Sequence, residues 1–249
     1  MKTNSTDTVL TTGNAAKLYC LKWIEQRIQN ENALTILDLG CGTAQNFARL
    51  LDCHPHVKYV GIEPSKNACE AARRNLASHD AVIIQAYAYD AFQLVHDHFD
   101  VVVSFSVLEH VLQRQRYLNS VRDCLKAEGH CLINYDAGHF VAPQGIKERL
   151  KNWIAPFLAH LRMEAYYQRF VREDEFLAMV KRADLEVVES KFLNTRLKGV
   201  HKQIPPQYQD EHMGRWLGYE LWLNELGITY RDGFAHTWMT RNFILRRRG

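Results

Sequence analysis

The sequence predicts an α/β protein built on a doubly wound, seven-stranded and mostly parallel sheet, with helices on both faces and helical cap insertions. Two observations predict this class. Short apolar runs alternate with segments of helical spacing through the first 135 residues, which is typical of parallel strands joined by crossover helices. The first of these runs ends in a glycine turn, at Gly40 and Gly42, directly before a helical segment. A ligand-binding turn at the end of the first strand is therefore expected.

Each element of the first half follows from its own pattern. The expected strands are residues 35–39, 57–62, 81–85, 99–105 and 130–135. The expected helices are residues 14–28, 44–51, 65–77 and 107–126. Pro64 suits a first helical turn, and Gly129 is interpreted as the stop of the last helix.

The second half is less regular. Residues 137–172 contain two prolines and several aromatic residues and are interpreted as an insertion, followed by a helix at 173–183 and a strand at 185–192. Residues 194–233 form a second expected insertion with a helix at 209–226, before a last strand at 235–245. We expect residues 1–249 to form a single domain, with both insertions as a cap or acceptor pocket.

Composition and charge exclude several classes of protein. Hydrophobic residues make up 47% and charged residues 24%, as in ordinary globular proteins, and the net charge is +3. The one dense basic run is Arg246–Arg248, so no nucleic-acid partner is expected. The six cysteines show no Cys-x-x-Cys pair and are expected to be reduced. No signal-peptide core or run of ~20 apolar residues is found, which predicts a cytoplasmic protein without a membrane partner.

The turn after the first strand reads Asp38-Leu39-Gly40-Cys41-Gly42-Thr43-Ala44. Glycines let the backbone bend sharply and approach a ligand closely. A dinucleotide fingerprint needs a third glycine at the sixth position, where this chain has Gln45. Asp38 would repel a pyrophosphate but could attract an ammonium group. The turn therefore favours a nucleoside that carries an amino acid.

These residues resemble the first motif of the class I S-adenosylmethionine-dependent methyltransferases, which have a Rossmann-like fold. Ala44 departs from that motif where a third glycine is usual. The resemblance implies that Asp38, Gly40, Cys41 and Gly42 lie under the methionine part of S-adenosylmethionine. It covers about residues 30–135, with weaker agreement at 173–192 and 235–245.

The resemblance assigns the nucleoside to the next two strand ends. Glu63, 21 residues after Gly42, would accept hydrogen bonds from both ribose hydroxyls, with Pro64 beside it. A helix N-terminal charge is the alternative role for Glu63. The family often has Gly-Asp-Ala after the third strand, and this chain has Ala86-Tyr87-Ala88 instead. Adenine could then be held by stacking on Tyr87, by the backbone of Ala88, or by Asp90.

The fourth strand adds a second match. Residues 99–111 resemble the run Phe-Asp-x-Val-x, five residues, Leu-Glu-His, which is common in small-molecule methyltransferases. The end of this strand would place Ser104 and Phe105 near the methionine and the transferred methyl group.

Methyl transfer requires alignment of the nucleophile, and a base only where the nucleophile loses a proton. His110 is the first candidate base, and the alternative is that it packs or caps the following helix. His139 and Asp136, after the fifth strand, are rival candidates. The other histidines show no metal spacing, so no metal site is expected.

The acceptor is expected to be a small organic molecule methylated on oxygen, nitrogen or carbon. The aromatic residues of the two insertions could line its pocket, form a helix-packing core, or form a homodimer interface. In relatives the first helix closes over the cofactor, which makes Tyr19 and Lys17 candidates for cofactor contacts. Two alternatives stay open: a noncatalytic S-adenosylmethionine-binding protein and, less favoured, a nicotinamide-dependent oxidoreductase.

Overall fold

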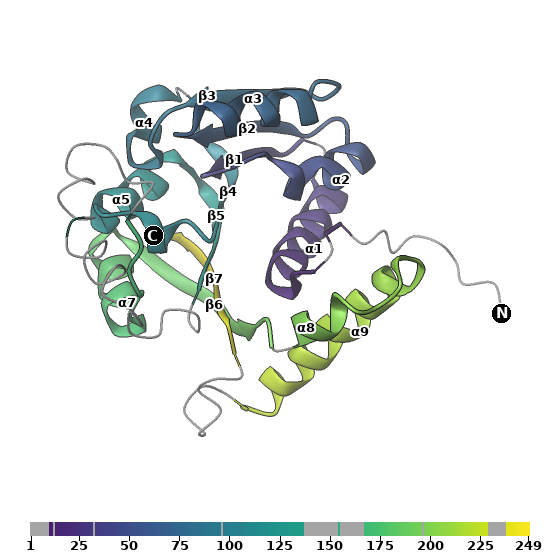
Figure 1. Cartoon of the computed structure of the whole chain (residues 1–249). Helices are drawn as coiled ribbons and strands as arrows, with labels where there is room; N and C mark the ends of the chain where they lie inside the picture. The colour runs from purple at the N-terminus through teal and green to yellow at the C-terminus, as the bar shows by residue number, and fades with distance from the viewer. Residues whose placement is uncertain are drawn as a thin grey trace.

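The computed structural model describes residues 10–11, 13–31, 33–95, 97–136, 154, 167–195, 197–228 and 238–249. Seven strands form one mixed sheet in the order β3-β2-β1-β4-β5-β7-β6 (Figure 1). This order confirms the doubly wound, Rossmann-like α/β class. The part of the chain after residue 136 adds the last two strands at one edge of the sheet.

The first five strands are parallel, and helices connect them. The strands are β1 Thr35–Leu39, β2 Lys58–Glu63, β3 Ala81–Gln85, β4 Phe99–Phe105 and β5 Leu125–Asp136. The helices are α1 Ala15–Asn30, α2 Gln45–Cys53, α3 Lys66–Asn75, α4 Ala91–Leu94 and α5 Arg114–Cys124, with short 3₁₀ turns η1 Ala88–Asp90 and η2 Leu108–His110. The carboxyl ends of β1, β2 and β4 meet at one edge, so the residues that follow them can share a ligand.

The second part completes the sheet in the opposite direction. Its elements are α7 Glu173–Arg182, β6 Leu185–Leu193, α8 Leu197–His201, α9 Pro206–Glu225 and β7 Thr240–Arg247. β7 runs antiparallel to both β5 and β6, with Tyr135 opposite Arg241 and Arg241 opposite Phe192. Register partners in neighbouring strands project to the same face of a sheet.

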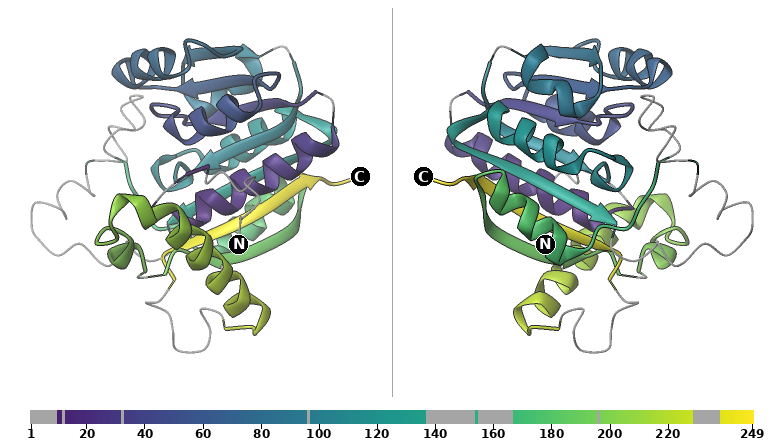
Figure 2. Two further views of the ribbon diagram at one scale, coloured as in Figure 1. Left: turned by 90° about the vertical axis from the view of Figure 1, so that its right-hand side faces the viewer. Right: turned by 90° about the vertical axis from the view of Figure 1, so that its left-hand side faces the viewer.

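Two buried cores cover the faces of the sheet. One core joins α1, α2 and α3 to the inward side chains of the strands and includes Trp216 of α9. The other joins α5 and α7 to the opposite face and includes Tyr135 and Phe243. The two views of Figure 2 show α1 crossing one face of the sheet and α5 and α7 covering the other. A ligand at the carboxyl edge can therefore meet side chains from two separate cores.

Three expectations about the elements were wrong. The helix expected at 107–126 is divided into η2 and α5, and α5 ends at Cys124. Gly129 does not stop a helix but lies inside β5, where an added Cβ would come 2.8 Å from the carbonyl oxygen of Phe99. The pairing of β4 with β5 shifts register at this point, and only glycine allows so close an approach. The strand expected at 130–135 consequently begins five residues earlier, at Leu125.

Other expectations lie partly outside the described residues. Of the insertion expected at 137–172, the structure describes residue 154 and residues 167–172. The second insertion contains α8 and α9, which confirms its expected helix. All six cysteines are free, as the sequence predicts.

Candidate active site

The glycine turn combines tight backbone packing on one side with open space on the other. The N–H groups of Gly40 and Cys41 donate to the carbonyl oxygen of Ile62, at 2.7 and 3.1 Å, and attach the turn to β2. A Cβ on Gly40 would lie 2.5 Å from a methyl carbon of Val107, whereas a Cβ on Gly42 would meet no atom within 4 Å. Gly42 thus borders a space in which a ligand can contact bare backbone.

Ala44 shows why the usual motif has a third glycine. Its φ is +56°, in the left-handed region, and its side chain is fully buried at the start of α2. An L residue in this conformation costs ~1–2 kcal/mol. Ser106, at the end of β4, also has a positive φ of 58°. Strained residues of this kind cluster at functional sites, and these two follow the strands that would carry the cofactor.

The Glu63 carboxylate is fixed at the end of β2 by two backbone donors. Its Oε2 accepts from the N–H of Gly42 at 3.1 Å, and its Oε1 accepts from the N–H of Ser65 at 2.9 Å. Each carboxylate oxygen keeps a further lone pair for another donor. The carboxylate is thereby joined to the glycine turn and can still accept two hydroxyl groups, as a ribose presents.

Asp38 is a buried carboxylate, and its side chain is 2% exposed. Its Oδ2 accepts a hydrogen bond of 2.7 Å from the hydroxyl of Tyr59. Burial raises the pKa of Asp38 to about 7, although the Tyr59 hydrogen bond and the positive charge of Lys17 oppose that rise. A cationic ligand beside Asp38 would favour its ionised form.

Lys17 on α1 supplies a cation near this carboxylate. Its Nζ donates to Oδ1 of Asn46 at 3.4 Å. Burial lowers the pKa of Lys17, the charges of Asp38 and Glu109 act in the opposite direction, and Lys198 adds to the lowering. The site therefore contains both an anion and a cation, which suits the ammonium and carboxylate of an amino acid.

Glu109 is a further functional candidate, which belongs to the Leu-Glu-His run but has no role predicted from the sequence. Its side chain is 2% exposed, and its Oε2 has no hydrogen-bond partner among the described residues. Burial raises the pKa of Glu109 to about 7, opposed by hydrogen bonds from the backbone of Glu109 and Asp136. A buried carboxyl that titrates near neutrality at the end of β4 can take or give a proton. The Leu-Glu-His run is the sequence feature from which Glu109 could have been identified.

The remaining nucleoside candidates lie at the same edge of the sheet. Pro64 is exposed beside Glu63, and Tyr87 is half-buried and stacks on Tyr89, with ring centroids 5.3 Å apart. Ala88 is buried at the start of η1. Asp90 forms an ion pair with Arg116, so this carboxylate already has a cationic partner.

Ser104 and Phe105 are buried more deeply than their predicted role requires. Ser104 is fully buried in β4, and Phe105 stacks on Phe47 at 6.0 Å within the core. Contacts from these two positions to a ligand would involve the backbone at the end of β4. Cys41, 4% exposed, fills the space left by Gly61, where an added Cβ would lie 2.8 Å from its sulfur.

Tyr19 and the two candidate histidines have different surroundings. The hydroxyl of Tyr19 donates to Oε1 of Glu189 on β6 at 2.6 Å, whereas Lys17 contacts Asn46 of α2. His110 is exposed, and its Nδ1 lies 3.1 Å from the carbonyl oxygen of Tyr167. His139 lies outside the described residues. His110 thus contributes to holding the chain after residue 166.

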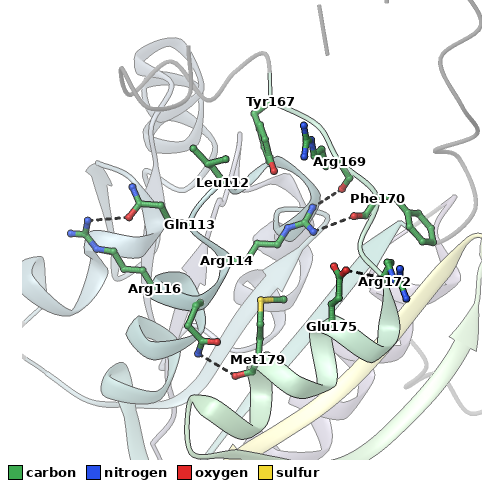
Figure 3. Close-up of a pocket in the computed structure, with 11 residues that line it drawn as sticks. Leu112, Gln113, Arg114, Arg116, Tyr167, Arg169, Phe170, Arg172, Glu175 and Met179 are labelled. Atoms are coloured by element: carbon green, nitrogen blue, oxygen red, sulfur yellow. Dashed lines mark hydrogen bonds and ion pairs between the residues drawn. The ribbon is translucent and has the colours of Figure 1, made fainter. Parts of the chain in front are cut away.

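Arg114 holds the same segment more extensively. Its guanidinium donates to the carbonyl oxygens of Leu108, Phe170 and Arg169, and Figure 3 shows it directed at the main chain of the last two. These groups border a pocket of 640 Å³ between α5 and α7. Arg116 and Arg172 lie at opposite ends of this pocket and pair with Asp90 and Asp174. The arginines therefore do not converge on one anion-binding point.

The aromatic residues of the insertions divide into separate groups. Trp216 is buried, and its Nε1–H donates to Oε1 of Glu220 in the helix-packing core. Tyr167 and Phe170 line the 640 Å³ pocket. Tyr219 and Trp222 lie about half exposed on α9. Trp216 thus belongs to a helix-packing core, whereas the acceptor pocket and the homodimer interface stay predictions for the other residues.

Neither a metal cluster nor a membrane segment is found in the described part of the chain. No group of three or more His, Cys, Asp or Glu residues there could hold a metal ion. None of the helices described is long and apolar enough to cross a membrane.

The sheet order defines a Rossmann-like α/β fold, with the glycine turn and Glu63 at the carboxyl ends of β1 and β2. A family model described as a methyltransferase domain matches residues 37–131, which contain these features. This match is consistent with a class I S-adenosylmethionine-dependent methyltransferase, and it supports S-adenosylmethionine as the cofactor.

Similar proteins act on different substrates. The chain is 30% identical over 153 residues to a tRNA U34 carboxymethyltransferase of a Shewanella species, covering 57% of this chain and 46% of the relative. It is 27% identical over 165 residues to a ubiquinone biosynthesis O-methyltransferase of Dinoroseobacter shibae, covering 64% and 62%. The match thus spans about half to three fifths of the length of these relatives.

A solved structure shows the same fold over most of the chain. The O-methyltransferase of a Brevibacillus brevis polyketide synthase, in complex with S-adenosylhomocysteine, aligns with a TM-score of 0.58 at 15% identity. The alignment covers 93% of this chain and 72% of that one.

Proposed function

We propose that this protein transfers a methyl group from S-adenosylmethionine to an oxygen, nitrogen or carbon of a small organic molecule and leaves S-adenosylhomocysteine. The observation that carries the proposal is the Glu63 carboxylate, held by the N–H groups of Gly42 and Ser65 beside the open face of the glycine turn. The chemistry of the donor set fits the cofactor, since buried Asp38 and Lys17 present one anion and one cation.

In this proposal each group of the chain has one role. Asp38 accepts the ammonium of the methionine part, Lys17 faces its carboxylate, and Glu63 accepts both ribose hydroxyls. Tyr87 and the backbone of Ala88 are assigned to the adenine, and Cys41 and Pro64 to the edges of the site. Bound there, S-adenosylmethionine supplies an electrophilic methyl group on a sulfonium. The protein aligns the nucleophile and excludes water.

For an acceptor that loses a proton, the described residues offer two bases after β4. Glu109 is buried with one unpartnered oxygen, and His110 is exposed. We assign proton removal to Glu109 because a carboxyl with a pKa of about 7 is poised at working pH. If instead the pH profile of transfer stays unchanged in Glu109→Gln and moves in His110→Gln, His110 is the base.

The small-molecule acceptor is supported by the O-methyltransferase relative and by the charge of the rim. Arg116 and Arg172 each pair with a carboxylate, so they offer little free charge to a phosphate backbone. A tRNA acceptor is the second candidate, and the carboxymethyltransferase relative favours it.

The cofactor assignment is tested by calorimetric titration with S-adenosylhomocysteine. Glu63→Gln should weaken binding about 30-fold or more, because charge-assisted hydrogen bonds contribute ~1.5–3 kcal/mol each. The matched control is Glu70→Gln, an exposed glutamate of α3 with the same change of charge. Equal affinities of these two variants would contradict the role of Glu63.

The acceptor is tested by measuring S-adenosylhomocysteine release with phenols, amines, carboxylic acids and bulk tRNA at two salt concentrations. Release with a small molecule supports the proposal. Release with tRNA alone, with a strong loss at high salt, identifies the second candidate. Binding without release on any acceptor identifies the noncatalytic alternative.

A further inference from the structure

A second, smaller pocket of 240 Å³ lies on the part of the sheet that the methyltransferase motif does not reach. Its floor is formed by Tyr135 of β5, Arg241 of β7 and Phe192 of β6, which are register partners across three adjacent strands. These strands lie side by side at the edge of the sheet in Figure 2. The segment before α7 and its first turn form the wall, with Phe170, Arg172 and Glu173 among its residues.

Arg241 in this pocket has a compensated charge and one unused donor. Its Nε and Nη2 donate to the two carboxylate oxygens of Glu173, at 3.1 and 2.6 Å. Its guanidinium carbon lies 3.7 Å from the ring centroid of Phe192 and 4.7 Å from that of Phe243. The residue is 5% exposed, and Nη1 has no hydrogen-bond partner among the described residues.

Tyr135 presents a second unused donor in the same pocket. Its side chain is 1% exposed, it packs against Phe176 and Phe243, and its hydroxyl has no partner in the described part of the chain. Burial raises the pKa of this hydroxyl, so it stays protonated and able to donate. A buried donor without a partner costs ~1–3 kcal/mol of folding free energy. Two residues that line one pocket carry such donors, which points to a ligand that accepts hydrogen bonds.

The charges around the pocket indicate what kind of acceptor fits. Arg241 is paired with Glu173, and Arg172 is paired with Asp174. No net positive charge is thus left to balance an anionic ligand, and the aromatic rings favour a flat apolar body.

We propose that this pocket binds an uncharged carbonyl group, as in a ketone, ester or amide, on a small aromatic molecule, with Tyr135 and Arg241 donating to the carbonyl oxygen. The site does not depend on the proposed transfer reaction, because its occupancy is an equilibrium property of the protein without cofactor.

The test compares three probes of similar size by saturation-transfer NMR titration: acetophenone, ethylbenzene and benzoate. Acetophenone should bind the wild-type protein most tightly of the three. In Tyr135→Phe its affinity should fall about fivefold, the value of one neutral hydrogen bond of ~1 kcal/mol, while ethylbenzene should be unaffected. Tighter binding of benzoate than of acetophenone, or an equal acetophenone affinity in Tyr135→Phe, would overturn the proposal.

Tyr117→Phe is the matched control. Tyr117 is fully buried in the same core, but it does not line the pocket. This variant should keep the wild-type affinity for acetophenone. Tyr135→Phe should melt at or above the wild-type temperature, because it loses an unpaired buried hydroxyl. A drop in melting temperature would mean that the hydroxyl is satisfied within the protein, and the proposal would fail.

Discussion

The two ends of the sheet differ in the kind of polar group that they bury. At β1, β2 and β4 the buried or backbone-held groups are carboxylates, Asp38, Glu63 and Glu109, which need donors. At β5 and β7 the buried groups are donors, Tyr135 and Arg241, which need an acceptor. One sheet thus offers complementary chemistry at two places.

The two ends of the sheet also differ in how far their polar residues can be predicted from the sequence. Asp38 and Glu63 lie in short motifs at the ends of strands, where spacing predicts their role. The donors come from strands more than 100 residues apart in the chain, Leu125–Asp136 and Thr240–Arg247, and meet only because β7 inserts between β5 and β6. The first region is readable from sequence, and the second is a product of topology.

The largest expected loss of stability distinguishes Gly40, on the packed side of the glycine turn, from Gly42, on its open side. Gly40→Ala combines a φ of +81° with a Cβ 2.5 Å from Val107, so it should lose about 3 kcal/mol or more of unfolding free energy. Gly42→Ala meets no atom within 4 Å and should lose only ~1–2 kcal/mol, from its φ of +56°. Its methyl group should instead weaken S-adenosylhomocysteine binding at least tenfold.

Urea denaturation and calorimetry measure the two quantities. The double variant Gly40→Ala/Val107→Ala should be more stable than the sum of the single variants predicts, because it removes the overlapping methyl carbons. Additive free energies, or wild-type ligand affinity in Gly42→Ala, would contradict the open-face geometry.

The next effect uses the raised pKa of Asp38. The carboxyl must be ionised to accept the ammonium of the ligand, so binding releases a proton when the pH is below about 7. The affinity for S-adenosylhomocysteine should therefore fall about tenfold per pH unit below that value. Calorimetry between pH 6 and 8, in two buffers of different ionisation enthalpy, measures both the affinity and the proton released. Asp38→Asn should bind weakly with a flatter pH dependence, and an unchanged slope in this variant would assign the proton to another group.

A smaller effect concerns the alanine that replaces the third glycine. Ala44→Gly relieves ~1–2 kcal/mol of backbone strain but loses a buried methyl worth ~0.8 kcal/mol and gains chain entropy in the unfolded state. Its unfolding free energy should stay within ~0.5 kcal/mol of wild type. The control, Ala72→Gly in the buried face of α3, has no strain to relieve and should lose ~2 kcal/mol. Similar losses in both variants would contradict the left-handed conformation of Ala44.

Much of the fold followed from the sequence, because strands with buried runs and glycine punctuation are local signals. The bounds of β1, β3 and β4 are those predicted. Gly129 was wrongly interpreted as a helix stop, because its role depends on the close approach of the Phe99 carbonyl oxygen, 30 residues away in the chain. Glu109 stood in its motif, but its burial, which gives it a pKa of about 7, required the fold. No sequence pattern pairs Tyr135 with Arg241.

The smallest expected effect is a pH dependence of stability that has opposite signs for the carboxylates and for His201. Asp38 and Glu109 have raised pKa values of about 7, so they stabilise the ligand-free protein at low pH and this contribution is lost as the pH rises through 7. Burial and the neighbouring His212 lower the pKa of His201, opposed by Asp210, so its contribution is present above its ordinary value and lost as the pH falls below 6.5.

The α8–α9 segment and the carboxylate site should therefore weaken at opposite ends of the neutral range. In melting experiments from pH 5 to 8, His201→Gln should lose less stability on acidification than the wild-type protein. Exposed His98→Gln should follow the wild-type curve. A steeper acid loss in His201→Gln would show that the His201–His212 contact, with Nδ1 atoms 3.1 Å apart, is stabilised by protonation, and the two regions would then respond to pH in the same direction.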